Sequence, residues 1–86
     1  MISDNNLDGR VRAIFQQLFE VAPEIINDQT RRGDLERWDS LGHLDLVETL
    51  RVEFQIDIRP EEALEMETIA DIKQIISVWL ADDIAK

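Results

Sequence analysis

Three side chains with reactive groups lie close together in the middle of the chain: the hydroxyl of Ser40, the imidazole of His43 and the carboxylate of Asp45. A nucleophile, a base and an orienting acid are the parts of a hydrolytic triad. Residues three and five positions apart on one predicted helix do not line up in that order, and no oxyanion hole is evident. A hydrolase built on these residues is therefore the least favoured of the function classes considered.

The carboxylates around Ser40 do not indicate a metal site. Asp39, Asp45 and Glu48 lack the alternating acidic ligands and central glycine of a calcium-binding loop. The chain has 0 Cys and 1 His, which excludes a disulfide framework, a Cys-based metal site and a nucleophilic thiol of its own. Any sulfur chemistry must therefore come from an added group.

Ser40 stands where a long loop meets the start of a predicted helix, and two roles fit that place. Asp39 or Ser40 can be the helix N-cap, whose side-chain oxygen accepts a backbone N–H, and a serine before an apolar helix most often does this. The hydroxyl is also expected to be exposed beside positive backbone dipoles, where an attached phosphate would be well placed. Position alone does not decide between the two roles.

Length and charge narrow the function classes. A chain of 86 residues suffices for one small domain, so we expect residues 1–86 to form a single unit. The net charge of −10 argues against binding to nucleic acids or anionic membranes, because both need clustered positive charge. With no secretory signal pattern and no apolar run of about 18 residues, we expect a cytoplasmic protein that binds basic protein partners.

The first half of the chain is predicted to contain one helix and one long loop. Apolar residues recur at three- and four-residue steps over residues 7–22, and Pro23 ends this helix because proline lacks the N–H that a continuing helix needs. Residues 23–39 show no sustained periodicity, and loops of this length are more often functional than idle. We expect four apolar side chains to hold the loop against the core: Ile25, Ile26, Leu35 and Trp38.

The second half is predicted to contain three further helices. Helical periodicity covers residues 40–54, and a turn over residues 57–60 leads to Pro60 at the first position of a brief third helix. Thr68-x-x-Asp71 is typical of a capping box, and the helix behind it should run to about residue 82. That helix carries one apolar stripe: Ile69, Ile72, Ile75, Ile76, Trp79 and Leu80. We therefore expect an all-α four-helix bundle, three longer helices plus one short third helix, around a single core.

The predicted helix over residues 40–54 has two faces. At about 100° per residue, one arc gathers the expected packing residues, namely Leu46, Val47, Leu50 and Phe54. The far arc mixes apolar and charged side chains, which neither a core face nor a solvated face favours. We expect this arc to dock partners through Leu41, Leu44, Asp45, Glu48 and Val52. The alternative is that Leu41 and Leu44 pack under the long loop.

His43 falls inside the packing arc, one turn below Ser40. It would then lie near the mouth of any cavity that shelters a bound chain. The alternative is a partly buried, hydrogen-bonded histidine without such a role, and this is the more common case. The two interpretations predict the same position for the ring and differ in what surrounds it.

The run Asp39-Ser40-Leu41, preceded by a helix and a long loop, resembles the motif of the acyl carrier protein family and its peptidyl and aminoacyl carrier relatives. The likeness spans nearly the whole chain and continues through Leu44-Asp45-Leu46-Val47-Glu48-x-Leu50-x-x-Glu53-Phe54 and Ile56-Asp57-Ile58. It implies a four-helix bundle whose serine, here Ser40 flanked by Asp39 and Leu41, receives 4′-phosphopantetheine from coenzyme A through a phosphopantetheinyl transferase.

The resemblance also implies how such a protein works. The thiol of the arm holds acyl groups as thioesters, so the chain is a monomeric shuttle between partner enzymes and performs no catalysis itself. Its acidic charge would speed encounters with basic docking patches on loading and synthase enzymes. Selectivity for the cargo lies mainly with those enzymes, and shelter for the cargo depends on a cavity between the second and fourth helices.

Several positions depart from the pattern of fatty-acid carriers. Gly42 stands where many of them have an acidic residue, Glu48 where they often have an exposed apolar one, and Arg37-Trp38 replaces a small, glycine-containing approach. Docking to housekeeping synthase partners is therefore in doubt, and the pattern is closer to discrete carriers of specialised pathways. Fatty-acid-like, secondary-metabolite, aminoacyl, peptidyl and D-alanyl cargo stay open. So does an unmodified helical interaction module, in which Ser40→Ala would leave binding intact.

Overall fold

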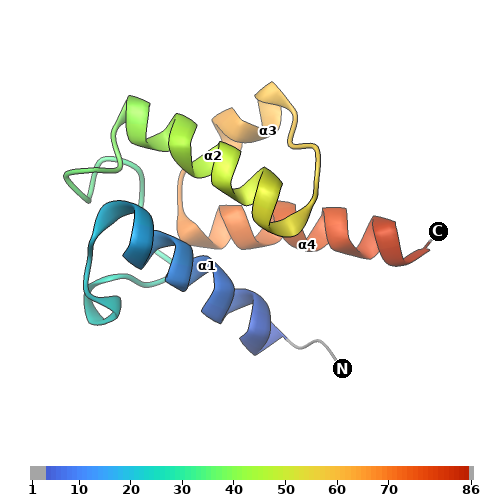
Figure 1. The fold of residues 1–86 in the computed structure, drawn as a ribbon, viewed down its shortest axis with the longest axis horizontal. Helices are drawn as coiled ribbons and strands as arrows, with labels where there is room; N and C mark the ends of the chain where they lie inside the picture. Colours follow the sequence, from blue (N-terminus) through green and yellow to red (C-terminus); the bar gives the residue numbers. More distant parts are fainter. Residues whose placement is uncertain (1–3, 86) are drawn as a thin grey trace.

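The computed structural model describes residues 4–85 and shows an all-helical chain (Figure 1). Four α-helices and one 3-10 turn follow one another in this order: α1 (Asp4–Phe19), η1 (Pro23–Ile25), α2 (Ser40–Phe54), α3 (Pro60–Glu65) and α4 (Ile69–Ala85). The predicted bundle of three longer helices and a short third one is confirmed. None of these described helices is both long and apolar enough to cross a membrane.

Two helix boundaries differ from those predicted. The first helix ends at Phe19 rather than residue 22, because Glu20 adopts a left-handed conformation with φ of 55° while its N–H still bonds to the Gln16 carbonyl at 2.9 Å. The last helix continues to Ala85 rather than stopping near residue 82. Between them, α2 begins and ends at the predicted residues, and Pro60 opens α3 at its first position.

Apolar side chains of the long loop hold it against the core. Four residues were predicted to do this, and three of them do. Ile26, Leu35 and Trp38 are buried, and the Trp38 ring meets Phe15 edge to face with ring centres 4.9 Å apart. Ile25 was expected in the same role, but that expectation is wrong, since its side chain is 58% exposed. Ile26, which directly follows the η1 turn, takes the inward position instead.

The apolar stripe of α4 is only partly a core stripe. Ile69, Ile72 and Ile76 are fully buried, whereas Ile75, Trp79 and Leu80 are half-buried. The predicted capping box precedes it, since Thr68 N–H donates to Asp71 Oδ2 at 3.1 Å and Asp71 N–H donates to Thr68 Oγ1 at 3.0 Å. In α2 the predicted packing residues Leu46, Leu50 and Phe54 are buried, but Val47 is half-buried because it faces a groove described below.

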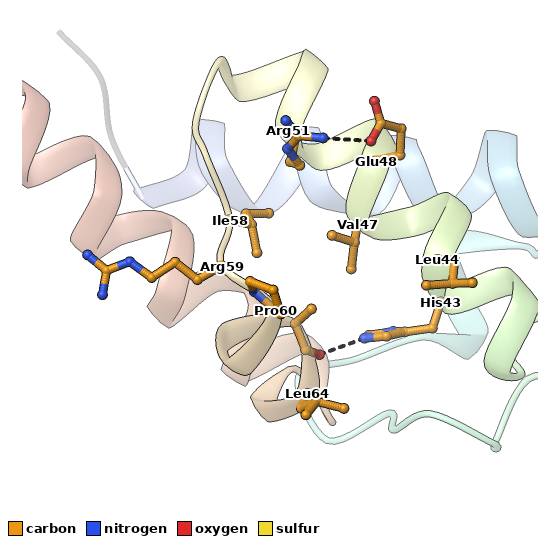
Figure 2. Close-up of a pocket in the computed structure, with 10 residues that line it drawn as sticks. His43, Leu44, Val47, Glu48, Arg51, Ile58, Arg59, Pro60 and Leu64 are labelled. Carbon is orange, nitrogen blue, oxygen red and sulfur yellow. Dashed lines mark hydrogen bonds and ion pairs between the residues drawn. The ribbon is translucent and has the colours of Figure 1, made fainter.

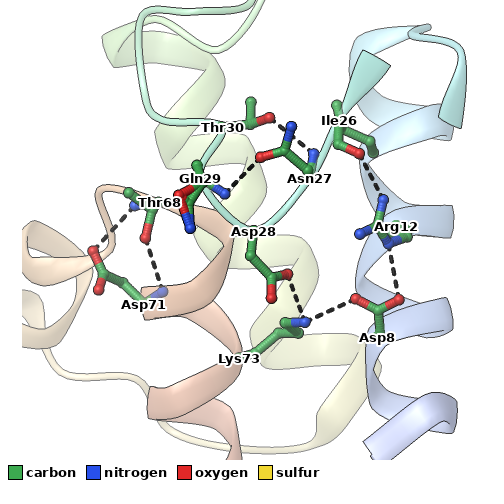
Figure 3. A network of polar contacts seen from close by, with 10 residues as sticks. All are labelled: Asp8, Arg12, Ile26, Asn27, Asp28, Gln29, Thr30, Thr68, Asp71 and Lys73. Atoms are coloured by element: carbon green, nitrogen blue, oxygen red, sulfur yellow. Dashed lines mark hydrogen bonds and ion pairs between the residues drawn. The ribbon is translucent and has the colours of Figure 1, made fainter. Parts of the chain in front are cut away.

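A polar network joins α1, the long loop and α4 (Figure 3). Lys73 Nζ lies 2.8 Å from Asp8 Oδ1 and 2.7 Å from Asp28 Oδ1. Arg12 pairs with the other oxygen of Asp8 at 2.8 Å and donates to the Ile26 carbonyl at 2.7 Å. The hydrogen bond from Lys73 lowers the pKa of Asp8, and those to Asp28 and Asp8 raise the pKa of Lys73.

Candidate functional site

The start of α2 leaves the hydroxyl of Ser40 available. Asp39 has an extended backbone, with φ of −100° and ψ of −163°, and its Oδ1 accepts the Gly42 N–H at 2.8 Å. Asp39 is therefore the N-cap residue, and Ser40 is the first residue of the helix. Since the capping bond is made by the aspartate, the exposed serine side chain is not needed for it.

Gly42 has a packing role that its sequence position did not reveal. A Cβ atom at this residue would overlap the backbone carbonyl oxygen of Arg37 and lie 3.1 Å from the Phe19 ring. Only a residue without a side chain fits, so the acidic residue found here in many fatty-acid carriers has no room in this chain. The departure at Gly42 is explained by the approach of the loop to α2, and docking is not needed to account for it.

His43 is buried between the loop and α3. The indole Nε1–H of Trp38 lies 3.0 Å from His43 Nδ1, and His43 Nε2 lies 2.8 Å from the Ala63 carbonyl oxygen. An indole nitrogen can only donate, so Nδ1 accepts and Nε2 carries the proton that it donates to Ala63. Burial lowers the pKa of His43, while the bond to Ala63 opposes that change and the charge of Arg32 adds to it.

A groove runs between α2 and α3 (Figure 2). It has a volume of about 510 Å³, and its apolar walls come from Val47 of α2, Ile58 of the connection, and Ala63 and Leu64 of α3. Charged side chains, among them the ion pair between Glu48 and Arg51 at 2.8 Å, also line it. We call this cavity the α2–α3 groove.

The α2–α3 groove lies beside the third helix, whereas the sequence pointed to a cavity between the second and fourth helices. Three isoleucines of α4, namely Ile69, Ile72 and Ile76, are fully buried in the core. By contrast, α3 has no buried residue and leaves room beside α2. His43 lines this groove, and its predicted hydrogen-bonded state is confirmed, although the residue is buried rather than partly buried. A role at the mouth of a cavity that shelters a bound chain stays a prediction.

A second cavity of about 390 Å³ adjoins Ser40, and we call it the Ser40 pocket. It is lined by Arg32, Ser40, His43, Leu44 and Leu64. The last three of these also line the α2–α3 groove, so the two cavities meet there. The sequence showed two adjacent arginines in the loop, but no pattern told which of them faces Ser40, and Arg32 was not predicted.

The residues predicted to dock partners all lie on the surface of α2. Leu41, Leu44 and Val52 are 75%, 66% and 69% exposed, and Asp45 and Glu48 are exposed beside them. The alternative that the two leucines pack under the loop is wrong. Leu64 of α3, 71% exposed, extends the apolar surface next to Leu44, and no sequence pattern singled it out.

A comparison with known families assigns the class of protein. A family model described as a phosphopantetheine attachment site matches residues 9–76. The chain belongs to this family, whose members are carrier domains rather than catalysts and hold covalently bound 4′-phosphopantetheine. Such domains interact with phosphopantetheinyl transferases and with biosynthetic enzymes. A search among curated proteins finds no significant match.

Proposed function

We propose that the chain is an acyl carrier protein and that Ser40, flanked by Asp39 and Leu41, is its attachment residue. The exposed hydroxyl at the first residue of α2, left free by the Asp39 cap, supports this. Modification joins the Ser40 oxygen to the phosphorus of coenzyme A that bears the pantetheine. The pyrophosphate bond breaks, the adenosine-containing half leaves, and the serine proton passes to the transferase.

The residues present fit the group that the family carries. Ser40 provides the attachment oxygen, Arg32 provides a cation in the same pocket, and Leu44 and Leu64 provide apolar contacts next to them. The chain has 0 Cys, so the thiol of the arm supplies the sulfur for thioester chemistry. The protein's own residues position the arm and present it to partner enzymes.

The α2–α3 groove is the observation that favours an acyl cargo over an aminoacyl or peptidyl one. Its apolar walls continue from the Ser40 pocket. Burying a methylene there is worth about 0.8 kcal/mol, whereas a charged ammonium placed against such walls would lose its hydration. An acyl chain of a fatty-acid-like or specialised pathway therefore gains from the groove, and an amino acid does not.

Partner enzymes are proposed to dock on α2 through Leu41, Leu44, Asp45, Glu48 and Val52, all of which are exposed. The net charge of −10 favours basic patches on the transferase and on the loading and synthase enzymes. We further propose that residues 1–86 act as one monomeric carrier domain in the cytoplasm.

Intact-protein mass spectrometry tests the attachment residue. The purified chain is incubated with coenzyme A and a broad-specificity phosphopantetheinyl transferase, beside Ser40→Ala and the matched control Ser77→Ala. Ser77 is also exposed but lies within α4. We expect one phosphopantetheinyl group on the parent and on Ser77→Ala, and none on Ser40→Ala. Addition to Ser40→Ala would refute the assignment, and a folded parent that binds partners without any addition would indicate an unmodified interaction module.

Methyl NMR tests the cargo. Spectra are recorded for the chain with a free arm, with an octanoyl group on the arm and with an alanyl group on the arm. We expect the methyl signals of Val47, Ile58 and Ala63 to shift with the octanoyl group and to stay near their unloaded positions with the alanyl group, while fully buried Val11 of α1 serves as the unaffected control. Equal shifts with both cargoes would contradict the preference for acyl groups.

A further inference from the structure

The backbone of the loop holds Arg32 close to the start of α2. Arg32 N–H donates to the Glu67 carbonyl at 2.7 Å, and Gly33 N–H donates to the Trp38 carbonyl at 3.0 Å. Gly33 has a φ of +100°, which a glycine adopts without strain and which lets the chain fold back on itself. The loop therefore holds Arg32 near Trp38, which directly precedes Asp39 and Ser40. These two hydrogen bonds restrict the backbone at Arg32 and Gly33.

The charge of Arg32 is not neutralised by a carboxylate within the described part of the chain. The other loop arginines do form ion pairs, Arg31 with Glu67 at 2.9 Å and Arg37 with Glu20 at 3.3 Å. Among the described residues, Arg32 and Arg59 are the two arginines without an ion pair, and Arg32 is the one that lines the Ser40 pocket. Its side chain is half-buried and lines the Ser40 pocket.

The Ser40 pocket has one cationic and two apolar lining side chains beside the attachment residue. Arg32, Leu44 and Leu64 line it together with Ser40, and the two leucines also line the α2–α3 groove. The first part of a phosphopantetheine arm carries matching groups: an anionic phosphodiester, followed by a carbon that bears two methyl groups. Guanidinium and phosphate form strong charge-assisted hydrogen bonds.

We propose that Arg32 binds the phosphodiester of the arm and that Leu44 and Leu64 contact its two methyl groups. This inference rests on the proposed attachment at Ser40. Arg32 is thus a positioning residue, which directs the rest of the arm toward the α2–α3 groove. Because Arg32 is partly exposed, salt screens its charge and the contact weakens as salt rises.

NMR of the full chain with the phosphopantetheine arm attached tests this proposal. Attachment at Ser40 is first verified by mass, and then ³¹P shifts and nuclear Overhauser effects from the two arm methyl groups are recorded for the parent, Arg32→Gln, Arg32→Lys and Arg31→Gln. Arg31 is a matched control, because it precedes Arg32 in the same loop but lines neither the Ser40 pocket nor the α2–α3 groove. Thermal unfolding followed by circular dichroism shows that each variant is folded.

We expect contacts between the arm methyl groups and Leu44 and Leu64 in the parent and in Arg31→Gln, and at least a threefold loss of their intensity in Arg32→Gln. Arg32→Lys should restore part of it, and 1 M NaCl should move the ³¹P shift of the parent toward that of Arg32→Gln. Unchanged contacts in folded, loaded Arg32→Gln would overturn the inference and leave Ser40 attachment standing. Absence of added mass on Ser40 would overturn both.

Discussion

At the scale of single residues, Gly42 shows how one missing side chain sets the approach of two segments. The first turn of α2 lies against the Arg37 carbonyl oxygen, and a Cβ would overlap it. Gly9, in the middle of α1, has no atom within 4 Å of the place where its Cβ would be. The same substitution at these two glycines should therefore have opposite effects.

Gly42→Ala is expected to lower the free energy of unfolding by about 1–3 kcal/mol, because the overlap forces a backbone shift. Gly9→Ala is expected to raise it by about 0.5–1 kcal/mol, because alanine loses less conformational entropy in a helix. Urea unfolding of both variants measures the difference. A stable Gly42→Ala would show that the loop can move away from α2.

His43 gives the second prediction at this scale. Burial lowers its pKa from the ordinary value near 6.5, so the folded chain favours the neutral ring. As pH falls below about 6.5, the unfolded chain binds a proton first and stability declines until the lower folded pKa is passed. Protonation also places an N–H on Nδ1, which then faces the Trp38 donor.

Urea unfolding at pH 7.5, 6.5 and 5.5 measures this for the parent and His43→Gln. The parent should lose more stability than the variant over that range, because glutamine does not titrate. Parallel profiles for the two chains would contradict the role assigned to His43.

At the scale of elements, α3 is held by hydrogen bonds more than by apolar packing. It has no buried residue of its own. The Ala63 carbonyl accepts from His43 of α2, and Glu62 Oε1 accepts from Trp79 Nε1 of α4 at 3.0 Å and from Arg59 N–H at 2.9 Å. The bonds from His43 and Trp79 join α3 to α2 and to α4, and the bond from Arg59 caps the start of α3.

Trp79→Phe removes the indole donor, which is worth about 1 kcal/mol or roughly a fivefold change in local opening. We expect amide exchange in α3 to speed up by about that factor while exchange in α1 is unchanged. Thr49→Val is the control, because it removes a side-chain hydrogen bond to Asp45 within α2 instead. An equal effect of both variants on α3 would refute the anchoring role of Trp79.

At the scale of the whole molecule, Lys73 links three segments that are far apart in sequence. It reaches Asp8 of α1 and Asp28 of the loop from its place on α4 (Figure 3). The lowered pKa of Asp8 means that its part of the stability is present above about pH 3.8 and is lost as pH falls through the lower folded value.

Lys73→Met should lower the free energy of unfolding by about 1 kcal/mol, since both ion pairs are partly exposed. Arg59→Gln removes the same charge without breaking a described ion pair and should change stability by less than about 0.5 kcal/mol. Urea unfolding in low and high salt checks both values. The effect of Lys73→Met should shrink in 1 M NaCl, and a salt-independent effect would point to packing of its carbon chain instead.

Local signals in the sequence predicted the helices. The bounds of α2, the proline that opens α3 and the Thr68–Asp71 capping box were all predicted correctly. Each depends on residues within about four positions of one another, where spacing and hydrogen-bonding side chains act without help from the rest of the chain. The resemblance to carrier proteins, carried by the residues around Ser40, is confirmed by the family match.

Only the tertiary structure decided what surrounds Ser40. Arg32 reaches the pocket because the loop folds back between the Glu67 and Trp38 carbonyls, and Gly42 is needed because the Arg37 carbonyl approaches α2. The α2–α3 groove lies beside α3, which has no buried residue, whereas three isoleucines of α4 are buried in the core. These features depend on contacts between residues distant in sequence, and such contacts leave no periodic pattern along the chain.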